Sequence, residues 1–241
     1  MAMSAPVSNV DPAEIDKFER LAARWWDPTS EFKTLHDINP LRLDYIDRRA
    51  PLAGATVLDV GCGGGLLSEA MAQCGARVTG IDMGTLPLRV ADLHCLESGL
   101  AIDYRQTSAE QLADECPGRF DTVVCMELLE HVPDPAALVA ACARLVRPGG
   151  HVFFSTLNRN PKSYLFAVLG AEYVLGLLPK GTHDFARFVR PAELMAWLRR
   201  AELRVMDLTG LSYCLLSREY RLVADDLSVN YLVTCRRDVP L

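Results

Sequence analysis

The stretch VLDVGCGGGLL, residues 57–67, constrains the fold of this chain most, because an apolar run gives way to four glycines in five residues and then to leucines. A short apolar run is typical of a buried strand, and the leucines begin a helical pattern. At a strand-to-helix junction the N–H groups of the helix point outward, and glycine lets the backbone approach a ligand or adopt a positive φ. The stretch therefore predicts a βα unit whose loop binds a nucleotide or nucleoside.

Short apolar runs alternate with helical patterns from about residue 55 to residue 158. The expected strands are Thr56–Val60, Arg77–Asp82, Ile102–Arg105, Phe120–Met126 and His151–Thr156, with two last strands near residues 204–214 and 230–235. The expected helices of this region are residues 66–74, 86–98 and 135–146. The alternation predicts βαβ units and a parallel sheet that is buried on both faces.

Helical segments are expected on both sides of this alternating region. Asp11 and Pro12 form a good cap and first-turn pair for a helix that would run to about Trp25, and Pro191 opens a later helix. We interpret residues 1–241 as a single domain. Its parts are an N-terminal helical segment at about 11–50, a cofactor-binding core at about 55–158 and an apolar lid or membrane-contact segment at about 162–190.

Composition narrows the class of protein. The formal net charge of -6 argues against nucleic acid as a partner, since phosphate binding favours a basic surface. The eight cysteines include no Cys-x-x-Cys pair, and several lie in apolar runs such as Val123–Cys125. We therefore expect reduced, buried thiols in a cytoplasmic protein rather than disulfides or a zinc site. No signal peptide is expected, because no basic region is followed by an apolar stretch at the N-terminus.

The spacing of the glycines distinguishes two cofactors. A dinucleotide fingerprint that starts at Gly61 would need glycine or alanine at its last position, which is Leu66. For this reason we set aside a NAD-dependent oxidoreductase. The run matches instead the acidic-x-Gly-x-Gly-x-Gly pattern of S-adenosylmethionine-dependent methyltransferases, at Asp59, Gly61, Gly63 and Gly65. Asp82, at the end of the second expected strand, suits the ribose hydroxyls of either cofactor.

Two resemblances extend this interpretation. The run RPGGHVFFST at 147–156, together with the closing strand pair, resembles the class I methyltransferase sheet. It implies an α/β, Rossmann-like sheet that is mostly parallel, with an antiparallel last strand and helices on both faces. Longer segments, including the distinctive Glu-x-x-Glu-His and Lys-Gly-Thr-His-Asp runs, resemble the ubiquinone-biosynthesis O-methyltransferases. These segments are residues 25–46, 58–72, 80–84, 93–99, 125–135, 153–163 and 170–184. The C-terminal fifty residues resemble that family less clearly.

The family resemblance implies an activity. A methyl group would pass from S-adenosylmethionine to a hydroxyl of a polyprenylated catechol or of demethylubiquinol, and other enzymes of ubiquinone biosynthesis would be partners. The motifs of the superfamily alone would also allow another small-molecule acceptor. A third alternative is a non-catalytic partner inside a biosynthetic complex, although this chain keeps both the glycine loop and the acidic residue at the strand end.

Five residues carry over to the cofactor site from the resemblance. Gly61 and Gly63 would let the backbone approach the cofactor, and Asp82 would hold its ribose. Met126, at the end of the fourth expected strand, would line the pocket, although such a methionine is as often core. Arg42 would pair with the carboxylate of the cofactor, a group that matches the guanidinium fork; from the residues alone it would be a solvated surface arginine.

The segment MELLEHVPDP raises the question of a metal. If a helical turn follows Met126, Glu127 and Glu130 share a face at i, i+3, and His131 joins Glu127 at i, i+4. Two carboxylates and an imidazole could hold one divalent cation, and oxygen-rich ligation suits magnesium. The family resemblance implies such a site. The alternative is that His131 acts as a general base without a metal.

The apolar run at 164–178 is too short, and too interrupted by Glu172, to span a bilayer. It is either an ordinary lid or core helix or an interfacial helix, and the flanking Lys162 and Lys180 suit the second. We expect peripheral membrane association of a cytoplasmic protein through this run, because a prenylated substrate lives in the membrane. His183 is a weaker candidate for a substrate contact or a loop cap.

Overall fold

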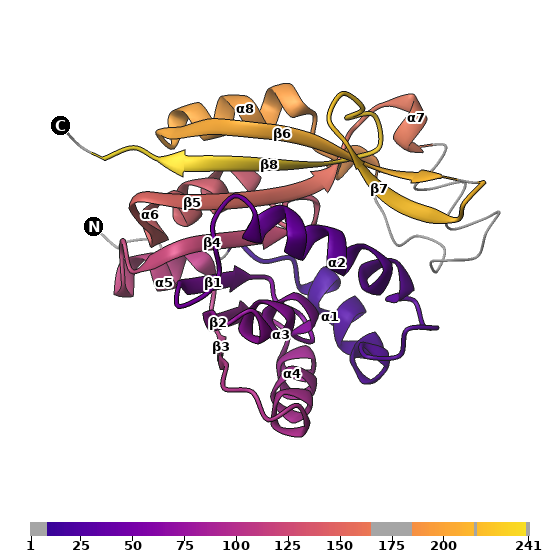
Figure 1. The fold of residues 1–241 in the computed structure, drawn as a ribbon, viewed down its shortest axis with the longest axis vertical. Helices are drawn as coiled ribbons and strands as arrows, with labels where there is room; N and C mark the ends of the chain where they lie inside the picture. The colour runs from indigo at the N-terminus through magenta and orange to yellow at the C-terminus, as the bar shows by residue number, and fades with distance from the viewer. Residues whose placement is uncertain (1–8, 165–184, 215, 240–241) are drawn as a thin grey trace, which may run out of the picture.

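The computed structural model describes residues 9–164, 185–214 and 216–239. Within them one eight-stranded sheet has the order β3-β2-β1-β4-β5-β8-β6-β7 (Figure 1). The strands are β1 Thr56–Val60, β2 Arg77–Asp82, β3 Asp103–Gln106, β4 Phe120–Met126, β5 Val146–Leu157, β6 Leu203–Cys214, β7 Glu219–Val223 and β8 Asn230–Arg237. The strands β1 to β5 are parallel, and β8 runs antiparallel to both β5 and β6. The predicted class I methyltransferase sheet is therefore confirmed.

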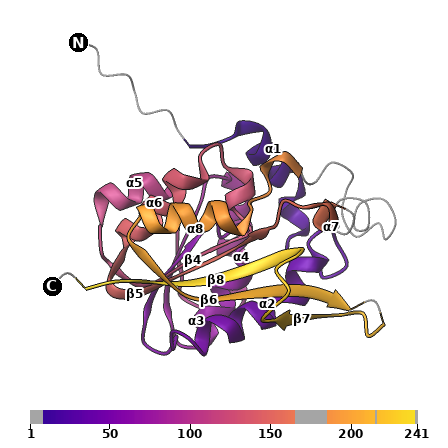
Figure 2. The ribbon, with the colours of Figure 1, turned by 90° about the horizontal axis from the view of Figure 1, so that it is seen from above.

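Helices cover both faces of the sheet (Figure 2). They are α1 Pro12–Leu21, η1 Ala22–Arg24, α2 Lys33–Asp47, α3 Leu66–Gln73, α4 Thr85–Glu97, α5 Ala109–Glu115, η2 Leu129–His131, α6 Pro135–Leu145, α7 Pro161–Ser163, η4 Phe185–Arg187 and α8 Pro191–Arg200. Successive side chains of a strand point to opposite faces, so Leu58 packs in the core formed with α5, α6 and α8, whereas Val57 packs in the core formed with α2 and α3.

The predicted bounds of β1, β2 and β4 are confirmed, and β3 lies one residue later than expected. The sequence interpretation missed α5, whose only strong signal is a capping box. The Ser108 hydroxyl accepts from the backbone N–H of Gln111, and the Gln111 side chain accepts from the backbone N–H of Ser108. It also missed β7, which adds an edge to the sheet, and it extended α1 beyond Leu21, where a short 3-10 turn follows.

The predicted apolar run at 164–178 lies, apart from Tyr164, outside the described residues, and so does His183. No helix in the described part of the chain is long and apolar enough to cross a membrane.

Asp121 of β4 stabilises the sheet through its ionised form. Its carboxylate accepts from the backbone N–H and hydroxyl of Thr56, at 2.8 and 2.6 Å, and from Arg147 Nε at 2.6 Å. The bonds from Thr56, followed by that from Arg147, lower the pKa of Asp121 to about 2. Because this pKa lies below the ordinary value near 3.8, the stabilisation is present above about pH 4 and is lost as the pH falls toward 2.

We expect Asp121→Asn to lower the free energy of unfolding by about 1 kcal/mol near neutral pH, a value reduced for the partial exposure of the side chain. The difference in the free energy of unfolding between the variant and the wild type should close near pH 2. Urea unfolding near neutral pH and near pH 2 would measure this difference. Asp114→Asn is the matched control, because its ion pair with Arg144 is exposed and should contribute little. An Asp121→Asn deficit that is the same at both pH values would contradict the assignment.

Candidate active site

A cavity of about 950 Å³ lies at the carboxyl ends of β1, β2 and β4. Ligands of open α/β sheets bind at this edge, and the volume is at the upper end of small-molecule sites. The cavity is lined by α1 and α2, by the loops after β1, β2 and β4, and by the facing ends of β6, β7 and β8. It includes every residue that the sequence interpretation assigned to the cofactor or to a metal, namely Arg42, Gly61, Gly63, Asp82, Met126, Glu127, Glu130 and His131.

The glycine loop needs glycine for two reasons. Gly61 and Gly63 have φ angles of 72° and 52°, which other residues rarely adopt. A Cβ on Gly61 would also lie 2.8 Å from the Leu128 side chain, and one on Gly63 would lie 2.1 Å from the Trp25 ring. The backbone of the loop therefore packs directly against the Leu128 and Trp25 side chains, and only glycine leaves room for this contact.

Two acidic residues lie next to this loop, Asp59 in β1 and Asp82 at the end of β2. The Asp82 carboxylate accepts from the backbone N–H groups of Gly63, at 3.0 Å, and of Gly84, at 2.7 Å. Asp59 is buried and accepts from the Ser68 hydroxyl at 2.6 Å. Burial raises the pKa of Asp82, and it raises the pKa of Asp59 to about 6. Asp82 thus fixes the loop, whereas Asp59 fixes the start of helix α3 that follows it. Both line the cavity, and Asp82 lies where the resemblance expects the ribose.

Two adjacent tryptophans, which the sequence interpretation did not assign to the site, contact the glycine loop, and Trp25 also lines the cavity. The Trp25 ring lies over Gly63 and Gly64 and stacks on Phe32, with ring centroids 4.1 Å apart. Trp26 donates from Nε1 to the Gly64 carbonyl at 2.8 Å, and its ring stacks on His94. The N-terminal segment is thereby attached directly to the cofactor loop.

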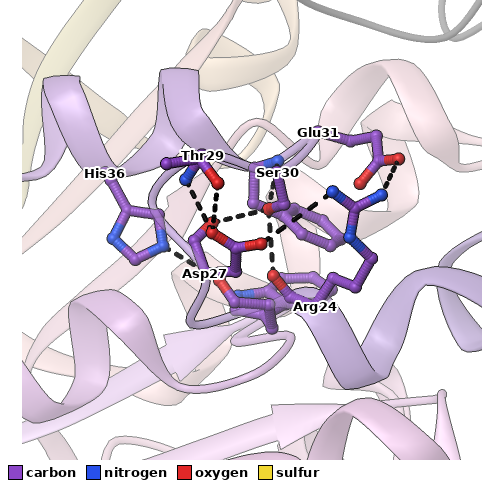
Figure 3. Close-up of polar contacts among 8 residues, drawn as sticks. Arg24, Asp27, Thr29, Ser30, Glu31 and His36 are labelled. Atoms are coloured by element: carbon purple, nitrogen blue, oxygen red, sulfur yellow. Dashed lines mark hydrogen bonds and ion pairs between the residues drawn. The ribbon is translucent and has the colours of Figure 1, made fainter.

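Hydrogen bonds and an ion pair within the turn at residues 24–31, together with His36, hold the tryptophan segment in place (Figure 3). The Asp27 carboxylate accepts from the backbone N–H and hydroxyl of Thr29, and Arg24 pairs with Glu31 at 2.6 Å. The Ser30 hydroxyl lies within hydrogen-bond distance of two carbonyl oxygens of the turn, at 2.9 and 2.7 Å, and His36 Nε2 lies 2.9 Å from the carbonyl of Trp25. These bonds explain the polar residues of the run that follows the tryptophans.

Arg42 is buried in α2 rather than solvated, with 5 % of its surface exposed. Its Nη2 donates to Asn39 Oδ1 at 3.3 Å, while its Nε is buried and has no hydrogen-bond partner within the described part of the chain. Burial lowers the pKa of Arg42, and the carboxyls of Glu127 and Asp59 oppose that shift. A buried guanidinium with an unused donor that lines the cavity suits an anionic ligand group.

We expect Arg42→Ala to weaken S-adenosylmethionine binding by about tenfold to a hundredfold, because a charge-assisted hydrogen bond to the carboxylate of the cofactor is lost. Calorimetric titration would measure the dissociation constant. Arg48→Ala is the control, since Arg48 follows the same helix at the surface and pairs only with exposed Asp44. Unchanged affinity of the Arg42 variant would remove this role.

Glu127 and Leu128, the two residues after Met126, do not form a helical turn. Glu127 has a φ of 53°, outside the helical region, and the short helix η2 begins only at Leu129. The condition on which Glu127, Glu130 and His131 would share one helical face is therefore not met. The backbone N–H of Glu127 donates to the carbonyl of Ser155 on β5, and this contact explains the turn.

Each of these three side chains has its own protein partner. Glu127 accepts from Ser155 Oγ at 2.6 Å and from Asn230 Nδ2 at 3.1 and 3.0 Å. Glu130 is buried and accepts from Thr156 Oγ1 at 2.7 Å. Among residues 9–164, 185–214 and 216–239, no group of three His, Cys, Asp or Glu side chains is placed to hold a metal ion. As placed, the three residues do not make up a ligand set for magnesium.

The ionisable groups at the carboxyl end of β4 influence one another, although, in the described part of the chain, they do not form a metal site. Burial raises the pKa of Glu130, and the neighbouring carboxyl of Glu127 raises it further. His131 Nδ1 lies 2.7 Å from Glu14 Oε2 of α1, and this hydrogen bond is the main cause that lowers the pKa of Glu14 to about 2. Glu14 is therefore ionised near neutral pH and accepts the hydrogen bond from Nδ1 of His131, so Nε2 is the ring nitrogen that Glu14 does not engage.

Comparison with known proteins decides the family. A family model described as "Methyltransferase domain" matches residues 16–208. The ubiquinone biosynthesis O-methyltransferase of Pseudomonas paraeruginosa is 67% identical over 232 residues, which cover 96% of this chain and all of the relative. The corresponding protein of Pseudomonas fluorescens strain SBW25 is 63% identical with the same coverage.

The chain belongs to the ubiquinone biosynthesis O-methyltransferase family. It is an enzyme, an S-adenosylmethionine-dependent O-methyltransferase. The relatives match over the C-terminal residues as well, although those residues showed the weaker resemblance.

Solved structures share the fold of this methyltransferase. Magnesium protoporphyrin IX methyltransferase from Synechocystis PCC 6803, with bound SAH, has a TM-score of 0.68 and 21% identity and covers 92% of this chain and 95% of its own. A possible histamine N-methyltransferase from Thermotoga maritima also has a TM-score of 0.68, with 16% identity, over 93% of this chain and all of its own. At these identities the likeness concerns the fold alone.

Proposed function

We propose that this enzyme transfers the methyl group of S-adenosylmethionine to a hydroxyl of a polyprenylated catechol or of demethylubiquinol. One observation carries the proposal: a single cavity contains both the cofactor loop and the polar residues at the end of β4. A donor and an acceptor molecule can then lie side by side in it. The names of the relatives, which match along their whole length, support the choice of acceptor.

The reaction needs few chemical steps from the protein. The acceptor oxygen attacks the methyl carbon in line with the sulfonium, the carbon–sulfur bond breaks, and sulfur keeps the electron pair. The hydroxyl proton must leave, and His131 Nε2 is the base that we assign, since Nδ1 is engaged with Glu14. Fixing both reactants in this geometry supplies much of the rate.

The cofactor residues of this mechanism are assigned by position. Gly61 and Gly63 leave room for the methionine and ribose portions, and Asp82 accepts from the ribose hydroxyls. Arg42 pairs with the carboxylate, and Met126, at the end of β4, packs against the cofactor. These roles agree with the burial and the unused hydrogen-bonding atom described above.

Magnesium stays a prediction for this enzyme. The proximity of Glu127 and Glu130, through which one raises the pKa of the other, supports it. The separate protein partners of these two residues and of His131 stand against it. A bound magnesium ion would orient a catechol oxygen and lower its pKa. We assign no step of the reaction to it.

The experiment that tests this function is the transfer of labelled methyl from S-adenosylmethionine to a short-prenyl catechol, with added magnesium and, in parallel, with chelator. Transfer under both conditions would support the acceptor and the His131 base. Transfer that depends on the ion would support the acceptor together with a metal at Glu127, Glu130 and His131. Transfer to a soluble catechol or amine, and none to the prenylated one, would identify another small-molecule methyltransferase.

We also propose that the cytoplasmic enzyme binds membranes peripherally through residues 164–178. The apolar character of the run, its flanking lysines and a prenylated acceptor support this location. Leu165→Glu combined with Phe166→Glu should lower binding to anionic liposomes by about tenfold and leave S-adenosylmethionine affinity unchanged. Liposome sedimentation would measure it, with Leu93→Glu as a control at an exposed leucine of α4. Equal binding of all three proteins would refute the proposal.

A further inference from the structure

Asn230 is the first residue of β8, and the antiparallel direction of β8 decides where it lies. It pairs with Leu157 at the end of β5 and with Leu211 of β6. An antiparallel strand begins where its parallel neighbour ends, so Asn230 reaches the ligand-binding edge of the sheet although it begins a strand. It lines the cavity together with Glu127.

The orientation of the Asn230 amide follows from its neighbours. Nδ2 donates to both oxygens of Glu127, at 3.1 and 3.0 Å, and Ser155 Oγ donates to the same carboxylate at 2.6 Å. The reversed amide would place its oxygen against the carboxylate oxygens, which is repulsive. The Nδ2 end of the amide thus faces Glu127, and Oδ1 is the atom left for another partner.

Asn230 Oδ1 is buried and has no hydrogen-bond partner among the described residues. Five buried side-chain atoms of that part of the chain lack one, on Trp25, Glu31, Arg42, Tyr104 and Asn230, and all except Tyr104 belong to residues that line the cavity. Buried polar atoms are almost always paired, because an unpaired one is costly. An unpaired acceptor beside a ligand cavity therefore indicates a donor on the ligand.

We propose that Asn230 Oδ1 accepts a hydrogen bond from the acceptor's ring hydroxyl that is not methylated. This inference rests on the proposed catechol acceptor. An amide oxygen accepts a hydrogen bond but does not take up a proton near neutral pH, so it does not serve the hydroxyl that must lose one. It suits the neighbouring hydroxyl, which keeps its proton. Asn230 then sets which of two adjacent oxygens faces the sulfonium methyl.

The test compares two acceptors in two proteins. The acceptors are a short-prenyl catechol and the matching monophenol. The monophenol keeps the hydroxyl that receives the methyl group and lacks the neighbouring one. Asn230→Ala should lower kcat/KM for the catechol about tenfold or more, mainly by raising KM. The same variant should change kcat/KM for the monophenol less than about twofold. A merely structural role would lower both values equally, and that result would overturn the proposal.

Matched controls separate this role from damage to the site. Asn158→Ala removes an amide that donates to the Leu227 carbonyl in the adjoining loop and that does not line the cavity, so the preference between acceptors should remain. Asn230→Ser repeats the comparison if the alanine variant does not fold. Wild-type inhibition constants that are equal for non-reacting catechol and monophenol analogues would overturn the proposal without any variant.

The same assays, with a soluble amine as a further acceptor, distinguish failure of the proposed function from failure of the proposed role of Asn230. Wild-type enzyme that methylates neither prenylated compound, but methylates a soluble amine, would refute the catechol acceptor itself. Wild-type enzyme that methylates the catechol, together with an unchanged preference in Asn230→Ala, would refute only the role of Asn230. A preference that chelator abolishes in the wild type would assign recognition of the hydroxyl to a metal and would also overturn the role.

Discussion

His131→Ala should lower kcat for methyl transfer by about 10²–10⁴-fold, the contribution typical of a general base. The reason is geometric: Nδ1 of His131 lies 2.7 Å from Glu14 Oε2, which leaves Nε2 as the ring nitrogen that can face the acceptor hydroxyl. Phe18 contacts the imidazole edge to face, with ring centroids 5.2 Å apart, and further restricts its orientation. Affinity for S-adenosylmethionine should not change, which calorimetric titration would check.

Two further variants make this result specific. His151→Ala is the control, because His151 is a half-buried histidine on β5 that does not line the cavity, and it should retain kcat. Glu14→Gln should lower kcat less than His131→Ala, since the imidazole remains but loses its charged partner. An unchanged kcat in His131→Ala would contradict the base. If His131 instead holds a metal, its variant should also need more magnesium for half-maximal activity.

Gly63→Ala should weaken S-adenosylmethionine binding by about a hundredfold or more, because the new Cβ meets a side chain that is itself fixed. It would lie 2.1 Å from Trp25 Cζ2, and φ at this position is 52°. Trp25 cannot retreat easily, since its ring is buried and stacked on Phe32. Titration with S-adenosylmethionine would give the affinity, and thermal unfolding the stability.

Gly99→Ala is the matched control for Gly63→Ala. Gly99 also has a positive φ, of 66°, but a Cβ there would have no neighbour within 4 Å among the residues that the structure describes. It should lose about 1 kcal/mol of stability from backbone strain and keep its cofactor affinity. Adding Trp25→Ala to Gly63→Ala should restore part of the binding. Equal affinities of the Gly63 and Gly99 variants would contradict the crowding argument.

Local patterns were enough for the central part of the fold. The apolar runs that became β1, β2 and β4 have the predicted bounds, since a strand buried on both faces gives a continuous signal. The short helix α5 was missed because its capping box, the one strong signal, is followed by only three small or apolar residues, Ala109, Leu112 and Ala113. The turn at Glu127 was misjudged because its positive φ depends on Ser155, a residue of another strand.

The sequence by itself determined the first two strands, the cofactor loop between them and the acidic residue at the end of β2, because each depends on the spacing within one βαβ unit. Only the tertiary structure decided that Trp25 covers the loop, that Glu14 orients His131 and that Asn230 holds Glu127. The last two contacts join residues 117 and 103 positions apart. Such pairs arise when helices and an antiparallel strand close over the edge of the sheet, and no local periodicity encodes which residues then meet.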